Sequence, residues 1–429
     1  MILSPEFRDR LKAIERRYRA VFSLDEYDES LALRWAFGAL VFAYYVAFVW
    51  WTSSDALTIQ SAQKGVHVCW PYFQECGSWY FLQTLPHGYL QTTLYMGLFG
   101  LLIHAVYRLS RREWMLAHLS LLIPFLWHFI AVFVLSVLNV GNYHYYLFFF
   151  GLILLFFPHK EFFLKLCIVL FYFLSTIAKL HESWVLGTYF SSLKTGLPLF
   201  PEWSIPFWTN LVIFMEMVGA WFLLSKQVVL QRAVLIFFIA FHLYSGILVE
   251  YRYPSTVLPM LIIMFGPFYR YSAPPLDRRS LIGWGMVLCM FLLQISPKLI
   301  PGDEKLTHEG NKYGLYMFES NHQCVSSTRR YWKDGSVTES TGESEIARVR
   351  CDPYTYWFRL KQFCARNKDS IERVEWTFDH SINGAAFLRI VEERDACALT
   401  YRPFGRNTWI KTDKDNPAVI GYPVENTYE

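Results

Sequence analysis

The chain has 429 residues, of which 54% are hydrophobic and only 18% charged, and its formal net charge is +4. Soluble globular domains usually carry about 25% charged residues, so much of this chain is expected to face lipid rather than water. The small net charge argues against a nucleic acid as partner. Composition therefore argues against an ordinary soluble protein, and together with the apolar segments described below it predicts a mostly α-helical membrane protein.

The N-terminal segment, residues 1–30, is polar and basic. It lacks the short apolar core and small-residue cleavage site of a secretory signal, so we expect the first apolar span to remain as a membrane helix. Segment 6–22 combines apolar and basic residues at helical spacing. That pattern fits a helix lying on the membrane surface or a solvated cytoplasmic helix, and both interpretations stay open.

A membrane-spanning helix needs roughly 20 mostly apolar residues. About nine candidate segments of this kind occur, and the fourth and eighth are short; the segments are 33–52, 88–107, 114–138, 143–158, 161–182, 206–225, 229–250, 254–269 and 281–298. After residue 300 charged residues return and no long apolar run follows. We therefore expect a transmembrane bundle over residues 31–300 and a small extracytoplasmic mixed α/β domain over 301–429.

Basic residues are distributed unequally between the connections. With the N-terminus in the cytoplasm, the inner side receives most of them, namely Arg8, Arg10, Lys12, Arg16, Arg17, Arg19, Arg108, Arg111, Arg112, Lys160, Lys165, Lys226, Arg232, Arg270, Arg278 and Arg279. The opposite connections carry Lys64, Lys194 and Arg252. The positive-inside rule then predicts that residues 301–429 lie outside. The sequence has no Asn-x-Ser/Thr acceptor, which favours a bacterial inner membrane over the endoplasmic reticulum.

The cysteines agree with this topology. Cys167 and Cys289 fall in apolar spans, whereas six others fall outside: Cys69, Cys76, Cys324, Cys351, Cys364 and Cys397. An even number in an oxidising compartment predicts disulfides, although the sequence does not choose their pairing. Because no CxxC occurs, neither a zinc ribbon nor a thioredoxin-type motif is expected. No metal site is expected either.

The C-terminal region reads as strands and one helix. Strand-like runs occur at 327–332, 373–379, 386–391 and 397–402, and residues 333–336 (KDGS) fit a hairpin turn. Segment 353–367 has the spacing of an amphipathic helix.

Several ionisable residues interrupt the apolar spans, where they are costly and point to function. The topology puts His144, Lys179 and His242 near the outer ends of three helices, where they could face one pocket. A desolvated lysine can act as a base; alternatively, Lys179 snorkels outward or pairs with Glu182. For His128 and Glu216 an interhelical hydrogen bond stays as open as chemistry, and His104 and His118 are expected to be ordinary packing residues.

Short motifs along the chain resemble the vitamin K-dependent gamma-carboxylase family, whose membrane part is the horizontally transferred transmembrane (HTTM) domain. Residues 178–187 (AKLHESWVLG) look like its K-L-x-x-x-W-x-x-G signature, residues 142–147 (NYHYYL) are similar to its Asn-x-His-x-Tyr-Leu helix start, and Phe241-His242 matches its Phe-His pair. Further motifs follow in the family's order at 332–335, 360–362, 381–383 and 403–409. The resemblance covers roughly residues 30–412.

The resemblance implies an enzyme of the carbon–carbon lyase class. Its cosubstrates would be a reduced vitamin K-type quinone (a quinol), O2 and CO2, without a metal. Oxygenation of the quinol to its epoxide would generate the base for carboxylating glutamate side chains of a secreted peptide or protein. The lipid-soluble reactants and the aqueous peptide would meet at the outer membrane boundary.

The implied roles are carried over by position. Lys179 matches the lysine that deprotonates the quinol and His144 the histidine that assists near CO2, while His242, Trp184, Asn142, His181 and Glu216 are expected at the quinone pocket. The family's paired lysines are here Ala178-Lys179, and its two acidic positions are His181 and Ser183. The chain also ends about where the carboxylase continues. Quinol oxygenation is therefore favoured over propeptide-guided carboxylation.

Two other functions stay open. The first is a non-catalytic membrane scaffold that serves maturation of, or immunity to, a secreted peptide, in which case His144 and Lys179 would be structural. The second is a transporter, for which no inverted repeat is visible.

Overall fold

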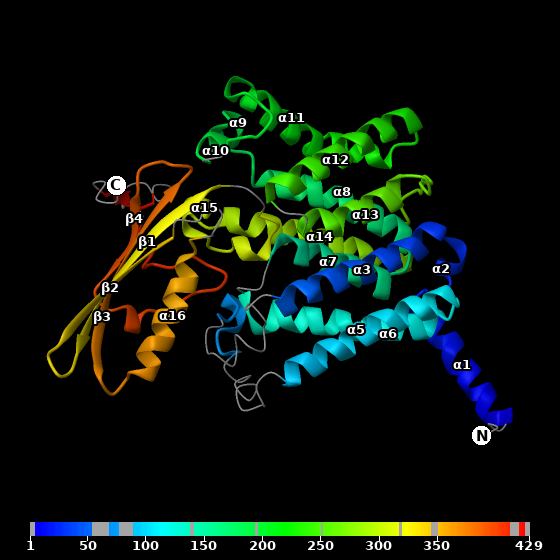
Figure 1. The fold of residues 1–429 in the computed structure, drawn as a ribbon, viewed down its shortest axis with the longest axis horizontal. Coiled ribbons are helices and arrows are strands. Elements are labelled where there is room, and N and C mark those ends of the chain that lie inside the picture. Colours follow the sequence, from blue (N-terminus) through cyan, green and yellow to red (C-terminus); the bar gives the residue numbers. More distant parts are fainter. Residues whose placement is uncertain are drawn as a thin grey trace. The chain divides into compact units, whose positions relative to one another are not determined.

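The computed structural model describes residues 5–53, 68–76, 89–137, 141–193, 196–249, 252–316, 320–344, 351–411 and 420–424 (Figure 1). Lys64 and Lys194, counted above among the outer basic residues, lie outside these ranges. The chain forms two compact units. We call Met1–His67, Glu75–Phe173 and Met217–Cys289 the helical unit, and Val68–Gln74, Leu174–Glu216 and Met290–Glu429 the sheet unit.

The helical unit consists of apolar helices and their short connections. Its elements are α1 (Pro5–Val21), α2 (Glu26–Glu29), α3 (Leu31–Ser53), α5 (Tyr89–Ser110), α6 (Trp114–Phe129), the π-helical η3 (Ile130–Leu135), α7 (Asn142–Phe156), most of α8 (Lys160–Ile177), η6 (Gly219–Leu224), α12 (Val228–Val249), α13 (Arg252–Phe265), η7 (Arg278–Ser280) and most of α14 (Leu281–Ile295).

Six helical segments of the described chain are long and apolar enough to cross a membrane: Leu31–Thr52, Thr92–Ser110, Trp114–Leu135, Glu202–Leu224, Val228–Leu248 and Arg278–Leu299. These segments mark a multi-pass membrane protein. The other three predicted spans are helices that fall short of this standard. α7 and α13 are too short, and α8 carries Lys160, Glu161 and Lys165 near its start.

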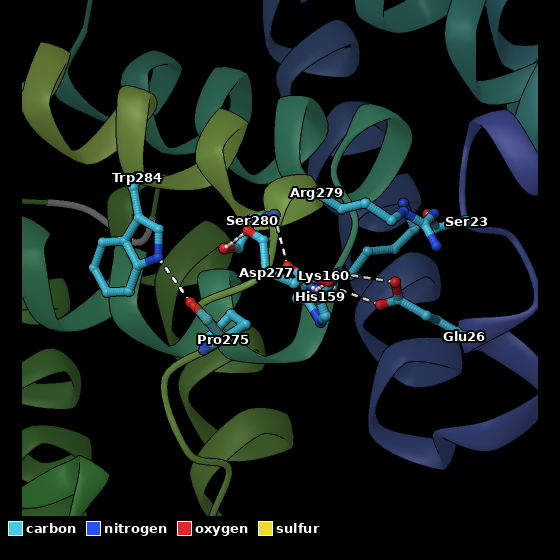
Figure 2. Close-up of polar contacts among 9 residues, drawn as sticks. All are labelled: Ser23, Glu26, His159, Lys160, Pro275, Asp277, Arg279, Ser280 and Trp284. Atoms are coloured by element: carbon cyan, nitrogen blue, oxygen red, sulfur yellow. Dashed lines mark hydrogen bonds and ion pairs between the residues drawn. The ribbon is translucent and has the colours of Figure 1, made fainter.

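Polar side chains fasten one end of the helical unit (Figure 2). The carboxylate of Glu26 accepts hydrogen bonds from the backbone N–H groups of His159 (2.8 Å) and Lys160 (2.7 Å), and so caps the first turn of α8. Asp277 accepts from the N–H of Ser280 at 2.9 Å and caps η7 in the same way. Both caps satisfy backbone donors that have no partner within their own helix.

The sheet unit combines short helices with one antiparallel sheet. Its helical elements are η1 (Pro71–Phe73), α9 (Glu182–Val185), α10 (Thr188–Ser191), η5 (Glu202–Ser204), most of α11 (Ile205–Met217), η8 (Ser296–Leu299), α15 (Glu304–Thr307), η9 (Asn311–Tyr313), α16 (Pro353–Arg366) and η10 (Ala396–Ala398). The strands are β1 (His322–Trp332), β2 (Val337–Ser344), β3 (Ile371–Ile382), β4 (Leu388–Glu393) and β5 (Tyr422–Pro423), in the order β2-β1-β3-β4-β5.

Most local predictions for this region are confirmed. The turn at 333–336 joins β1 to β2, with Tyr331 paired to Val337 and Gly335 at φ 86°. The predicted helix at 353–367 is α16. The expected strand at 397–402 is wrong, because η10 and irregular backbone occupy it. β2 was missed, since its sequence VTESTGES is polar and shows little alternation.

Disulfides hold α16 at both ends. Cys324 of β1 bonds Cys351, just before the helix, and Cys364 of the helix bonds Cys397 of η10. Inside this frame Tyr356 of α16 packs on Phe378 of β3 with ring centroids 4.9 Å apart. Cys69 and Cys76 are also disulfide-bonded, so all six predicted cysteines are paired. Cys167 and Cys289 are free thiols, as expected.

Candidate functional site

His144 lies in a buried pair of histidines in the helical unit. It is the third residue of α7, and its Nδ1 lies 2.9 Å from Nε2 of His128 in the last turn of α6. The ring of Trp51 contacts both imidazoles, with centroids 5.3 Å from His144 and 5.8 Å from His128. A π-helical segment, often found near functional sites, begins two residues after His128. Asn142 is half-buried as the first residue of α7.

His242 belongs to a second polar group of the helical unit. Its Nε2 lies 2.5 Å from the hydroxyl of Tyr172 on α8, and its ring contacts that of Tyr253 at 5.3 Å. The hydroxyl of Tyr253 in turn lies 3.0 Å from that of Tyr146 on α7. These tyrosines were not predicted as site residues, because in an aromatic-rich chain they resemble ordinary packing residues.

Lys179 lies in the sheet unit, two residues beyond the end of α8. Its Nζ donates to Oε2 of Glu216 at 2.6 Å, and the hydroxyl of Thr176 donates to the same oxygen at 2.5 Å. The Lys179 and Glu216 side chains are each only 4% exposed. The alternative that Lys179 pairs with Glu182 is wrong, since Glu182 is exposed and Glu216 supplies the carboxylate.

The segment after Lys179 folds into two short helical turns. His181 precedes α9 in extended conformation, and the buried Trp184 stands 5.2 Å from Nζ of Lys179, measured to its ring centroid. Gly187 separates α9 from α10 with φ 77°, and a Cβ there would lie 2.7 Å from Cγ2 of Ile205. Both the backbone conformation and the contact require glycine, which gives the last residue of the K-L-x-x-x-W-x-x-G pattern a physical reason.

Lys179 is buried as predicted for a desolvated lysine, but it is paired with the carboxylate of Glu216. A buried ion pair loses hydration on both partners, and this loss is offset only when the geometry is good and further hydrogen bonds are made. Here Thr176 supplies an additional hydrogen bond and Trp184 an aromatic face for the cation. The cluster can therefore exchange a proton between Nζ and Oε2, and it can equally hold residues 176–179 against α11 as a structural pair.

The predicted site residues thus fall into two sets. His144, His242 and Asn142 belong to the helical unit, whereas Lys179, His181, Trp184 and Glu216 belong to the sheet unit. Within the sheet unit the structure brings Lys179, Glu216 and Trp184 together. Sequence reasoning missed Thr176, because a threonine in an apolar helix carries no signal of its own.

A further cluster was also missed. His308, His322 and His380 of the sheet unit each offer a ring nitrogen, and these atoms lie within 4.8 Å of one another. No metal was expected because the sequence has no CxxC, and these histidines are too far apart in the chain to form a ligand motif.

An apolar groove of about 440 Å³ lies in the helical unit, lined by Leu243, Pro254, Ser255, Leu258, Pro259, Ile262 and Ile263. Leu243 follows His242 in α12.

Comparison of the chain with protein-family models, curated proteins and solved structures finds no match to any of them.

Proposed function

We propose that this chain is a multi-pass membrane enzyme that oxygenates a lipid-soluble quinol, with Lys179 and Glu216 as its proton-handling pair. The resemblance of residues 178–187 to the carboxylase signature suggests the reaction. One observation carries the assignment to residues: a lysine and a glutamate form a buried pair, 2.6 Å apart, in an apolar chain. Such a placement is costly and therefore typical of functional sites in membrane proteins.

The proposal includes the topology. About nine spans would run from a cytoplasmic N-terminus to an extracytoplasmic sheet, in a bacterial inner membrane. The three disulfides support an oxidising compartment for the cysteine-bearing segments. The basic residues concentrated in alternate connections support the orientation.

The residues around Lys179 suit a naphthoquinol. A bound quinol would supply an acidic hydroxyl and a ring that reacts with O2 to give the epoxide and water. Trp184 offers an aromatic wall, and the Lys179–Glu216 pair offers a proton acceptor beside it. When the shared proton resides on Oε2 of Glu216, Nζ of Lys179 carries a lone pair and can accept the hydroxyl proton. The resulting ammonium would stabilise the new anion.

Carboxylation of glutamate side chains is the second part of the proposal. His144 would assist the step that uses CO2, and a secreted peptide or protein would be the partner substrate. These roles rest on the resemblance of residues 142–147 to the family's helix start. The buried contact of His144 with His128 supports a histidine whose ring is held in place.

The decisive variant is Lys179→Arg. Arginine keeps the positive charge and can still pair with Glu216, but it does not give up its proton in proteins. If Lys179 is a base, quinol epoxidation should fall by about 100-fold or more while membrane insertion and stability persist. The measurement is mass spectrometry of naphthoquinol products after aerobic incubation with purified protein, with labelled O2 to mark the epoxide oxygen.

Lys298→Ala is the matched control, because Lys298 is an exposed lysine of the sheet unit paired with Glu304. It should epoxidise quinol like the wild type. Wild-type turnover by Lys179→Arg or Lys179→Ala would refute the assigned role.

A non-catalytic scaffold is the second candidate, favoured by the completeness of the Lys179 contacts. An amine already bonded to a carboxylate and facing an aromatic ring is fully accounted for as a structural link. This function predicts no quinol product from the wild-type protein. Here Lys179→Arg should preserve maturation of, or immunity to, the secreted peptide.

A further inference from the structure

Three histidines from separate parts of the chain meet inside the sheet unit. His308 follows α15, His322 opens β1, and His380 lies in β3. Their exposed fractions are 2%, 1% and 0%. One nitrogen from each ring lies within 4.8 Å of the others. Three buried imidazoles this close together need a physical account.

Strand register places two of the rings on the same face. Cys324 is directly opposite His380, and His322 precedes Cys324 by two residues. Side chains two apart on a strand share a face, so His322 and His380 are diagonal neighbours. His308 ends α15 in left-handed conformation, with φ 55°, and its ring centroid lies 4.7 Å from that of His322.

The hydrogen bonds of His380 leave a nitrogen suited to a metal. Its Nδ1 lies 2.8 Å from the carbonyl oxygen of Leu306 and donates its proton there, so Nε2 carries a lone pair. Metal-binding histidines commonly show this arrangement, in which a backbone carbonyl fixes the ring through the other nitrogen.

Asn311 can orient His308 in the same way. Its amide nitrogen lies 2.8 Å from Nδ1 of His308, while its Oδ1 is buried with no hydrogen-bond partner in the described chain. Rotating the amide by half a turn would place Oδ1 against an Nδ1–H of His308. That rotation satisfies the buried oxygen and leaves Nε2 of His308 with a lone pair.

We propose that His308, His322 and His380 bind one divalent transition-metal ion, of which Zn²⁺ is the best fit. Nδ1 of His322 lies 3.1 Å from Nε2 of His380, whereas two nitrogens on a tetrahedral zinc ion are about 3.3 Å apart. His322 moves its proton from Nδ1 to Nε2 when the ion binds. A set of three neutral imidazoles suits zinc-like ions and not Ca²⁺ or Mg²⁺, which prefer oxygen ligands.

The proposed ion has a clear mechanical consequence. His308 lies shortly after η8, the helical turn that follows α14, whereas β1 and β3 are neighbouring inner strands of the sheet. Metal binding would fasten the chain to the sheet where it leaves the last apolar helix. This inference does not depend on the quinol chemistry.

The test uses the full chain purified in detergent, stripped with a chelator and then titrated with Zn²⁺ alone or Co²⁺ alone. We expect one tightly held ion per chain by elemental analysis, and visible ligand-field absorption from Co²⁺ in a tetrahedral nitrogen site. The double variant His322→Ala/His380→Ala should lose both signals. His159→Ala, which alters a histidine of the helical unit bonded to Asp277, should keep them.

Two outcomes would overturn the site. In the first, the stripped wild type retains no ion after dialysis; in the second, the double variant binds as much metal as the wild type. Peptide mapping of the Cys324–Cys351 disulfide checks that the variant sheet is folded, because Cys324 is opposite His380.

Asn311 provides a gentler test that leaves all three ligands in place. Asn311→Asp keeps an oxygen for Nδ1–H of His308 and should retain the metal. Asn311→Leu should weaken binding by about 10- to 100-fold, as losses of such supporting contacts do. Equal affinity of Asn311→Leu and the wild type would contradict the assignment of His308 as a ligand.

Discussion

The sheet unit contains two buried polar clusters that differ in how charge is balanced. Lys179 and Glu216 carry opposite charges and meet at 2.6 Å, so the pair is electrically neutral by itself. The histidine cluster instead consists of three imidazoles buried within 4.8 Å of one another, and the carboxylates of Asp303 and Asp352 act on His380 only from outside the group. The contacts within the first cluster account for its burial whether or not a ligand binds. The second cluster brings together nitrogen lone pairs, as in the binding site of a metal ion.

The clusters are also connected through the chain. Trp184, which faces Lys179, stacks on Tyr189 with ring centroids 5.1 Å apart. The carbonyl of Tyr189 accepts a hydrogen bond from the amide of Asn321 at 2.7 Å, and Asn321 directly precedes His322. A substitution that displaces Trp184 would therefore disturb the contacts of Tyr189 and Asn321, next to the histidine cluster.

The largest effect should come from removing one partner of the charged pair. Lys179→Met leaves Glu216 buried without its counter-charge and should destabilise the protein by about 3 to 5 kcal/mol. Adding Glu216→Leu should recover most of that loss, because the double variant buries no unpaired charge. Thermal unfolding in detergent measures both, and equal melting temperatures for Lys179→Met and wild type would show that the pair contributes little.

Acid should then affect the histidine cluster of the metal-free protein. His380 has a pKa of about 4 when folded against 6.5 unfolded, so the unfolded chain binds more protons between these values. The contribution of His380 to the free energy of unfolding is therefore fully present above pH 6.5, and it falls by about 3 kcal/mol as the pH drops towards 4. Unfolding of wild type and His380→Gln across this range is the measurement, and the variant should show a smaller slope.

Substitution of Gly187 should have a moderate effect. Gly187→Ala forces a side chain into left-handed backbone and against Ile205, with an expected cost of about 2 kcal/mol. Gly335→Ala is the matched control, since Gly335 also has positive φ but nothing lies within 4 Å of its Cβ position. The difference in melting temperature between the two isolates the contact with Ile205, and similar shifts would argue that backbone strain alone is responsible.

The smallest effect is expected for an exposed ion pair. Arg329 and Glu339 lie across β1 and β2, with side chains 53% and 63% exposed. Arg329→Ala should change stability by about 0 to 1 kcal/mol, because water and salt screen such pairs. A shift as large as that of Lys179→Met would mean that burial is not what distinguishes the two ion pairs.

Local features could be predicted from sequence, but partners distant in the chain could not. The KDGS turn and helix α16 follow from turn residues and amphipathic spacing over a few positions. For Lys179 the same reasoning offered Glu182, because only neighbours in the chain were visible. The true partner, Glu216, is 37 residues away.

The apolar helices of a multi-pass membrane protein, a hairpin-containing C-terminal sheet and the pairing of six cysteines could all be predicted from the amino-acid sequence. These properties depend on run length, local turn chemistry and residue counts. Which cysteines bond, which carboxylate meets Lys179 and the convergence of three histidines follow from the folded chain, since His322 and His380 are 58 residues apart. Strand register and helix packing bring such residues together, and neither leaves a short-range pattern in the chain.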